Sequence, residues 1–172
     1  ASIARECGAE VPFIRPSELS GDYTGTADVL VHAISWLKEN GCDVDIFCCI
    51  YPTAPLLQSE YVVQGYDLLR ESGCSTVLSV ATYPYPILRS LKINDEGRVK
   101  MMWPENYEKR SQDLPEAYHD AGQFYWADVS KFMEEKCLFS SDSVPVVIPR
   151  HLVQDIDTEE DWEMAEKLYH SL

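Results

Sequence analysis

The sequence predicts one α/β domain with a mainly parallel sheet. Apolar segments of strand length alternate with segments of helical periodicity, and the connections between them are short. The segments 44–51 and 75–81 are almost continuously hydrophobic, which is typical of strands covered on both faces. A chain of 172 residues suits a single domain, and neither an internal repeat nor a low-complexity linker divides it.

The first half of the chain is expected to hold three helices and three strands. Gly8, Gly41 and Gly73 each follow a helical segment, as C-terminal glycines do. Thr26 and Ser59 are expected to cap the second and third helices. The expected elements are a helix ending over 2–7, a strand over 11–14, a helix over 26–40, a strand over 44–51, a helix over 59–73 and a strand over 75–81.

The second half begins with a different pattern. The turn sequence Asn94-Asp95-Glu96-Gly97 separates 87–93 from 98–102 and predicts a β-hairpin, which a polar, loop-like stretch over 107–118 follows. Trp162, Ala165 and Leu168 of the last helix are expected to face inward. The remaining elements expected are a strand over 123–126, a helix over 128–136, a strand over 144–148 and a last helix capped by Thr158.

Composition and charge exclude several classes of function. The net charge of −15 argues against nucleic-acid binding, which needs clustered Lys and Arg, although a divalent cation can mediate contact with an anionic nucleotide. No apolar run approaches the roughly 20 residues that span a bilayer, and no signal peptide is visible. The six cysteines show neither a CxxC pair nor metal-ligand spacing with histidine, so we expect a reducing, cytoplasmic compartment.

The sequence "DIDTEEDW" near the C-terminus has two interpretations. In an extended segment Asp155 and Asp157 face the same way, with Ile156 turned to the core, and two carboxylates can bind Mg²⁺ together with substrate phosphates. Acidic residues also suit the N-terminus of a helix, with no metal involved. A third interpretation, a DxDxT phosphatase, fails because Glu159 stands in place of the required threonine.

Polar residues also gather before the second helix and after the strand 44–51. Arg15 follows the expected strand 11–14, at the edge where α/β proteins bind ligands. Ser20 and Asp22 add a hydroxyl and a carboxylate before a helix start, which suits an anion or a sugar hydroxyl. Thr53, in "YPTAPLL", could bond a base or a ribose. Turn formation and helix capping are the simpler explanation of the residues before the helix, and a rigid turn at the strand end is the alternative for Thr53.

A third polar group surrounds the start of the strand 123–126. Arginine suits a carboxylate, and amides and phenols suit hydroxyl groups, so the group fits a carboxylated, hydroxylated ligand. A polar dimerisation arm is the alternative. The residues are Arg110, Gln112, Tyr118, His119 and Gln123.

Taken in order, these segments resemble the acylneuraminate cytidylyltransferase family. The resemblance rests on "RPSELSGD", "YPTAPL", "STVLSV" followed by Pro84 and Pro86, "RSQDLPEAYHDAGQFY" and "DIDTEEDW", which together span almost the whole chain. Tyr51, where many sialic acid enzymes have glutamine, and the sequence "HDAGQFYW" resemble the pseudaminic acid branch.

The resemblance implies a Rossmann-like nucleotide-diphospho-sugar transferase fold and an activity. The enzyme would couple CTP to a nine-carbon 2-keto acid sugar, pseudaminic acid being favoured, and release pyrophosphate with the help of Mg²⁺. By position, Asp155 and Asp157 would be the Mg²⁺ ligands and catalytic residues together with Arg15. Ser20, Asp22 and Thr53 would bind the nucleotide. Arg110, Gln112, Tyr118, His119 and Gln123 would lie toward the sugar, and a hairpin arm over about 87–118 would pair subunits into a homodimer.

One departure from the family pattern affects the expected activity. The family begins with a strand and a basic phosphate loop of the type "ARGGSKxxxxKN", and this sequence contains no such segment. We therefore expect this chain to bind CTP weakly and to turn over slowly or not at all. The alternatives are a cytidylyltransferase for neuraminic, legionaminic or 3-deoxy-manno-octulosonic acid, and a non-catalytic fragment or dimerisation module.

Overall fold

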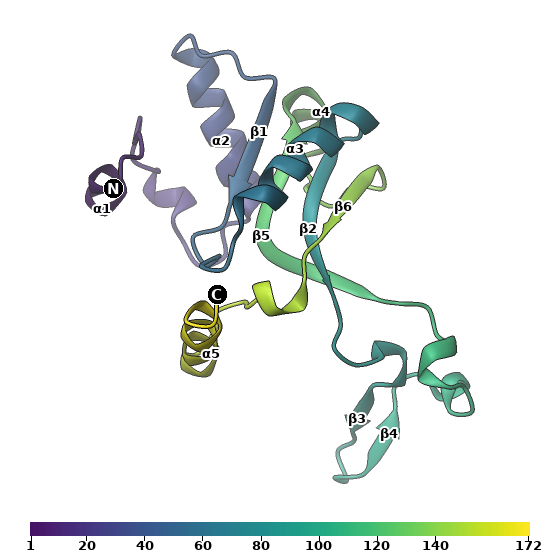
Figure 1. The fold of residues 1–172 in the computed structure, drawn as a ribbon. Helices are drawn as coiled ribbons and strands as arrows, with labels where there is room; N and C mark the ends of the chain where they lie inside the picture. The colour runs from purple at the N-terminus through teal and green to yellow at the C-terminus, as the bar shows by residue number, and fades with distance from the viewer.

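A computed structural model describes all residues from 1 to 172 (Figure 1). A four-stranded sheet with the order β1-β5-β2-β6 forms the body, and a separate two-stranded hairpin, β3-β4, projects from it. The strands are β1 Ile46–Ile50, β2 Thr76–Thr82, β3 Leu91–Ile93, β4 Val99–Met101, β5 Tyr118–Asp128 and β6 Ser143–Val147. The α-helices are α1 Ser2–Glu6, α2 Thr26–Glu39, α3 Ser59–Ser72, α4 Val129–Glu135 and α5 Glu159–Tyr169. The 3₁₀ turns are η1 Ser17–Leu19, η2 Ile87–Arg89, η3 Pro104–Asn106, η4 Ser111–Asp113 and η5 Arg150–Leu152.

The α/β prediction is confirmed, and the sheet is mixed. Strands β1, β2 and β6 run in one direction, as predicted, while β5 lies between β1 and β2 and is antiparallel to both. The chain passes from β2 to β5 through the hairpin arm and not through a crossover helix, so β5 returns antiparallel. β5 is also much longer than the predicted strand 123–126.

Two apolar cores cover the two faces of this sheet. Leu69 of α3 packs with Phe124 and Val146 in one core. On the other face Ile34 of α2 and Phe132 of α4 pack with residues that include Tyr125 of β5. Phe124 and Tyr125 are neighbours that point to opposite faces, as successive strand residues do. β5 therefore contributes a buried aromatic ring to each core.

Some local predictions are confirmed and others are wrong. Thr158 caps α5 in a capping box with Asp161, as predicted for the cap. Residues 11–14 form no strand. Thr26 and Ser59 are the first helical residues and not the caps, which are Gly25 and Gln58.

In α5 the predicted inward face is only partly buried. Ala165 is buried, but Trp162 is 54% exposed. The reason is that α5 packs beside the loop that follows β1 and not on the sheet (Figure 1). No α-helix of the structure has the length and hydrophobicity that a membrane-spanning segment needs.

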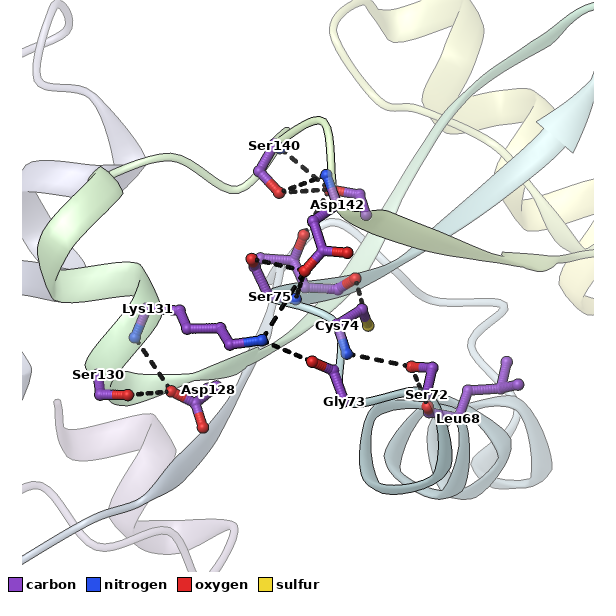
Figure 2. Close-up of polar contacts among 12 residues, drawn as sticks. Leu68, Ser72, Gly73, Cys74, Ser75, Asp128, Ser130, Lys131, Ser140 and Asp142 are labelled. Carbon is purple, nitrogen blue, oxygen red and sulfur yellow. Dashed lines mark hydrogen bonds and ion pairs between the residues drawn. The ribbon is translucent and has the colours of Figure 1, made fainter.

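A polar cluster ties the elements together at the end of the sheet where β2 and β6 begin (Figure 2). The Asp142 carboxylate accepts hydrogen bonds from the Ser75 amide at 3.0 Å and from the Ser75 hydroxyl at 3.1 Å. Lys131 of α4 donates to the Gly73 carbonyl at the end of α3 and lies 3.8 Å from the same carboxylate. Because Ser75 is buried, its two donors depend on Asp142.

Replacing Asp142 by alanine should therefore lower the free energy of unfolding by about 2 kcal/mol, since it leaves two buried donors unpaired. The control is Glu96→Ala, which removes an exposed carboxylate 3.5 Å from Arg98. That exposed pair should contribute less than about 0.5 kcal/mol. Urea denaturation followed by circular dichroism measures both values. Equal losses in the two variants would show that the Ser75 contacts do not stabilise the fold.

Candidate active site at the carboxyl ends of the strands

The candidate site lies where β1 and β6 end and β5 bulges. β1 and β6 run in the same direction, so the loops that follow them emerge at the same end of the sheet. This carboxyl end of the strands is where α/β domains bind ligands. The first of these loops carries Thr53, and the second carries Asp155 and Asp157.

The bulge interrupts the pairing of β5 with β2. Leu78 pairs with Tyr125, so regular pairing would place Gln123 opposite Val80. Asp120 stands there instead, because β5 carries the extra residues 121–123. Gly122 in this insertion has φ +62°, a left-handed conformation that glycine adopts without strain. Bulges of this kind often lie beside active sites, where they redirect a strand.

The hydroxyl of Ser79 on β2 fills the gap that the bulge opens. It accepts hydrogen bonds from the Phe124 amide at 3.2 Å and the Gln123 amide at 3.4 Å, and it lies 3.3 Å from the Phe124 carbonyl, to which it donates. Ser79 is fully buried. A buried hydroxyl thus replaces ladder bonds that the bulge removes.

Asp155 and Asp157 are both exposed, and Ile156 between them is half-buried against the loop after β1. The Asp155 Oδ1 atom accepts the Ile156 amide at 3.1 Å, and the Asp157 carboxylate makes no hydrogen bond within the chain. A Cβ atom added at Gly122 would lie 3.8 Å from Asp155 Oδ1, so this carboxylate sits beside the bulge.

The helix-terminus interpretation of the acidic run applies to Asp161. Its Oδ2 atom accepts the Thr158 hydroxyl at 2.7 Å and the Thr158 amide at 2.9 Å. The Thr158 hydroxyl and the Thr158 and Asp157 amides hold the pKa of Asp161 below its ordinary value. The capping box therefore occupies Asp161, and the carboxylate oxygens of Asp155 and Asp157 are left largely free.

The donor set fits Mg²⁺ shared with a substrate and does not fit a metal site built by protein alone. No group of three or more His, Cys, Asp or Glu side chains in the chain is arranged to hold a metal. Mg²⁺ usually keeps several water ligands and binds proteins through one or two carboxylates plus substrate phosphates. Asp155 and Asp157 could hold the ion in that way.

Thr53 shares a pocket with Ile156, the residue between the two aspartates. It lines a half-open pocket of about 380 Å³ with Ile156, Trp162 and Tyr169. The pocket connects the loop after β1 with α5. Thr53 is therefore close to the segment that carries the two aspartates.

The polar residues before α2 reach the same end of β1. The Thr26 hydroxyl lies 2.9 Å from the Tyr51 hydroxyl, which joins the start of α2 to the residue after β1. Arg15 and Asp22 are exposed and make no hydrogen bond or ion pair through their side chains. The Ser20 hydroxyl donates to the Pro16 carbonyl at 2.9 Å, so it serves the local turn.

The third predicted group is divided between the bulge and the arm. Gln123 is buried on β5, and its Nε2 donates to the Leu152 carbonyl at 2.5 Å, which ties the bulge to the loop before Asp155. The half-buried His119 ring packs on Tyr83 at 5.0 Å, at the end of β5 nearer the arm. Only Gln123 of this group belongs to the bulge.

The other three members lie on the arm side. The Arg110 guanidinium forms two hydrogen bonds with Asp113, at 2.7 and 2.9 Å, and so is already paired. The exposed Tyr118 hydroxyl donates to Glu116 at 2.6 Å. Gln112 lines a separate pocket of about 300 Å³ at the base of the arm.

Three residues of the site were not identified from the sequence: Ser79, Asp120 and Tyr125. The Asp120 carboxylate accepts the Tyr125 hydroxyl and, at 2.9 Å, the Gly122 amide. Burial, followed by the hydrogen bond to Asp120, holds the pKa of Tyr125 well above its ordinary value. The spacing Asp-x-Gly was a usable signal, because an aspartate often bonds the amide two residues later.

Cys48 and Cys49, the two cysteines of β1, are poor nucleophiles. All six cysteines of the chain are free thiols. Burial, with a smaller contribution from the neighbouring Cys49, raises the pKa of Cys48 to about 12, and burial also raises the pKa of Cys49. Both thiols therefore stay protonated near neutral pH, and a thiolate is the reactive form of cysteine.

Comparison with known proteins places the chain in a family, although no protein-family model matches it. It is 38% identical over 167 residues to a pseudaminic acid cytidylyltransferase of Campylobacter jejuni, covering 97% of this chain and 72% of the relative. A CMP-N,N'-diacetyllegionaminic acid synthase of Legionella pneumophila is 25% identical over 170 residues, covering 98% and 72%. An N-acylneuraminate cytidylyltransferase of Escherichia coli is 25% identical over 167 residues, covering 95% and 38%. The chain therefore belongs to the acylneuraminate cytidylyltransferase family, on its pseudaminic acid cytidylyltransferase branch.

Proposed function

We propose that this chain transfers the cytidylyl group of CTP to a nine-carbon 2-keto acid sugar, with pseudaminic acid as the favoured acceptor. The observation that carries the proposal is the 38% identity to pseudaminic acid cytidylyltransferases along nearly the whole chain. The free carboxylates of Asp155 and Asp157 at the carboxyl ends of the strands support it, because nucleotide chemistry in α/β domains occurs at that edge.

In the proposed reaction a hydroxyl oxygen of the sugar bonds to the α-phosphorus of CTP. The bond from that phosphorus to the departing pyrophosphate breaks, and the hydroxyl proton passes to water. Arg15 is exposed and makes no bond within the chain, so it is free to face an anionic group of the nucleotide, and Asp22 and Thr53 are exposed as well. Ser20 would hold the turn that presents them.

Asp155 and Asp157 would hold Mg²⁺ together with phosphate oxygens of the substrate. The bound ion would neutralise the triphosphate and the charge that develops on pyrophosphate as it leaves. This role also accounts for how a chain with a net charge of −15 could accept a polyanion.

Gln123 would face the acid sugar from the bulge, because its Nε2 is fixed on Leu152 and its Oε1 makes no bond within the chain. His119, Tyr118, Gln112 and Arg110 would contribute from the arm side. Arg110 would have to exchange its bond with Asp113 for the sugar carboxylate. We place the enzyme in the cytoplasm, which agrees with its six free thiols.

Replacing either Asp155 or Asp157 by asparagine should lower the rate of pyrophosphate release at least 100-fold. A neutral amide binds Mg²⁺ far more weakly than a carboxylate does. Rate losses of this size are usual when a central electrostatic group of an active site is removed. The matched control is Glu160→Gln, which removes an exposed carboxylate from the first turn of α5. The control should stay within about twofold of the original rate. An equal loss in all three variants would favour a purely structural acidic helix start.

The choice of sugar is tested by offering pseudaminic, neuraminic and legionaminic acid separately with CTP and Mg²⁺, and by following the CMP-sugar by mass spectrometry. We expect the largest kcat/KM with pseudaminic acid. Greater activity with neuraminic or legionaminic acid would contradict the branch assignment and leave the cytidylyl transfer intact. No product with any acid sugar, and no stabilisation by CTP with Mg²⁺ in thermal unfolding, would favour a non-catalytic module.

We also propose that the β3-β4 arm joins two copies of the chain into a homodimer. Leu91, Ile93 and Val99 point to one face of the hairpin and are 61%, 74% and 62% exposed. Lys92 and Lys100, which pair across the strands, occupy the other face. An isolated two-stranded hairpin is barely stable in water, so a partner on the apolar face would stabilise the arm.

Ile93→Glu should therefore convert the dimer to a monomer, as measured by light scattering coupled to gel filtration. Lys92→Glu, one residue away on the lysine face, makes a larger change in charge and should leave the dimer intact. A monomer for the unmodified chain at micromolar concentration, or an equal response of the two variants, would contradict pairing through the apolar face.

A further inference from the structure

The β5 bulge depends on a carboxylate to which the proposed chemistry gives no role. Asp120 uses one oxygen to accept the Gly122 amide and the other to accept the Tyr125 hydroxyl. Both oxygens are thus engaged within β5, so Asp120 serves the shape of the strand and is not a free metal ligand like Asp157.

The Asp120–Tyr125 bond can exist only when β5 is bulged. The two residues are five positions apart, and an odd separation places side chains on opposite faces of a regular strand. The insertion 121–123 changes this, because Asp120 and Tyr125 pair with Val80 and Leu78, which share a face. Slipping β5 into regular register would break the bond and turn Asp120 to the other face.

Tyr125 is a rigid anchor for this carboxylate. Its side chain is buried, and its ring packs on Tyr51 at 5.2 Å. The Tyr51 hydroxyl in turn bonds Thr26 at the start of α2. The raised pKa of Tyr125 keeps the phenol protonated, so it donates to Asp120 throughout the ordinary pH range.

The bulge contacts the loop of the two aspartates at two points. Gly122 lies beside Asp155 Oδ1, at a place where an added Cβ atom would be 3.8 Å away. Gln123 holds the Leu152 carbonyl, at the point where the chain turns toward Asp155. The path of this loop therefore follows the position of residues 121–123.

We propose that Asp120 is a positioning residue which, with Tyr125 as its anchor, holds the β5 bulge and so fixes the loop that carries Asp155 and Asp157. The structural part of this inference stands by itself. Its catalytic consequence rests on the proposed cytidylyl transfer, in which those aspartates hold Mg²⁺.

The chain offers a matched control at the other end of the same strand. Asp128 is the last residue of β5, and its carboxylate also accepts one hydroxyl, that of Ser130 at 2.6 Å, and one amide, that of Lys131 at 3.0 Å. Asp128→Asn and Asp120→Asn each remove one carboxylate charge from β5. In Asp128→Asn the charge is lost at the end of the strand that leads into α4, away from the bulge. A merely structural role for Asp120 would make the two variants behave alike.

Initial rates of pyrophosphate release are measured against Mg²⁺ concentration for Asp120→Asn, Tyr125→Phe, the double variant and Asp128→Asn. Each of the first two should raise the Mg²⁺ concentration for half-maximal rate about tenfold, the usual effect of removing a group that orients metal ligands. Saturating Mg²⁺ should restore most of the rate. The double variant should shift no further than the singles, because both break one bond. A Mg²⁺ dependence equal to that of Asp128→Asn would overturn the proposal.

A second measurement needs no activity. Amide hydrogen exchange, followed by nuclear magnetic resonance, reports Gly122, whose amide Asp120 accepts, and Ile156, whose amide Asp155 accepts. Asp120→Asn should speed exchange at both amides at least tenfold, and Asp128→Asn at neither. Faster exchange at Gly122 alone would show that the bulge does not fix the loop. If the unmodified chain transfers no cytidylyl group, the proposed function fails, and the exchange at Ile156 still decides this inference.

Discussion

The position of β5 between β1 and β2 is the constraint on which the rest of the structure depends. β5 forms both antiparallel ladders of the body, and its side chains enter the cores on both faces of the sheet. Gly65 of α3 shows how tightly it is packed, since a Cβ atom there would lie 2.8 Å from the rings of Phe124 and Trp126. Interiors packed to this density do not deform continuously. β5 could therefore shift to another register only as a whole, because partial shifts would clash with the packed side chains.

The bulge is the one place where this strand departs from regular pairing, and polar groups stabilise the departure. Ser79 satisfies amides that have lost their partners in β2, and Asp120 satisfies the amide of Gly122. An unpaired buried amide costs about 1–3 kcal/mol, so the buried bonds of Ser79 stabilise the bulged register, and the exposed bond of Asp120 adds to them. The body of the sheet is fixed by apolar packing, whereas the end that carries the candidate site is fixed by hydrogen bonds.

The sequence predicted the elements well where the pattern is local. Continuous apolar runs located β1 and β2, and Thr158 with the acids after it located the start of α5. The strand over 11–14 was wrong because that segment has no neighbouring strand with which to pair, and pairing is not a local property. Thr26 is the first helical residue and not the predicted cap, and its hydroxyl bonds Tyr51, 25 residues away.

The candidate site is only partly visible in the sequence for the same reason. The two-residue spacing of Asp155 and Asp157 can be read from the sequence, whereas the place of Gln123 in the bulge depends on the insertion in β5. Arg110 and Tyr118 have the side chains that an acid sugar needs, yet each is held by a nearby carboxylate, Asp113 and Glu116. Residue type and order in the chain do not reveal such local competition.

The acidic run before α5 starts a helix and also carries carboxylates that the helix does not use. A helix N-terminus favours negative charge near it, and one well-placed carboxylate, that of Asp161, satisfies the capping box. Additional carboxylates lie farther from the helix N-terminus, so it stabilises their negative charge less, and they repel one another. Asp155 and Asp157 therefore carry charge that the fold itself does not neutralise. A divalent cation would relieve that repulsion at the moment when it brings in a polyphosphate. In the proposed enzyme the same excess of negative charge would bind Mg²⁺ and keep the nucleotide from binding without it.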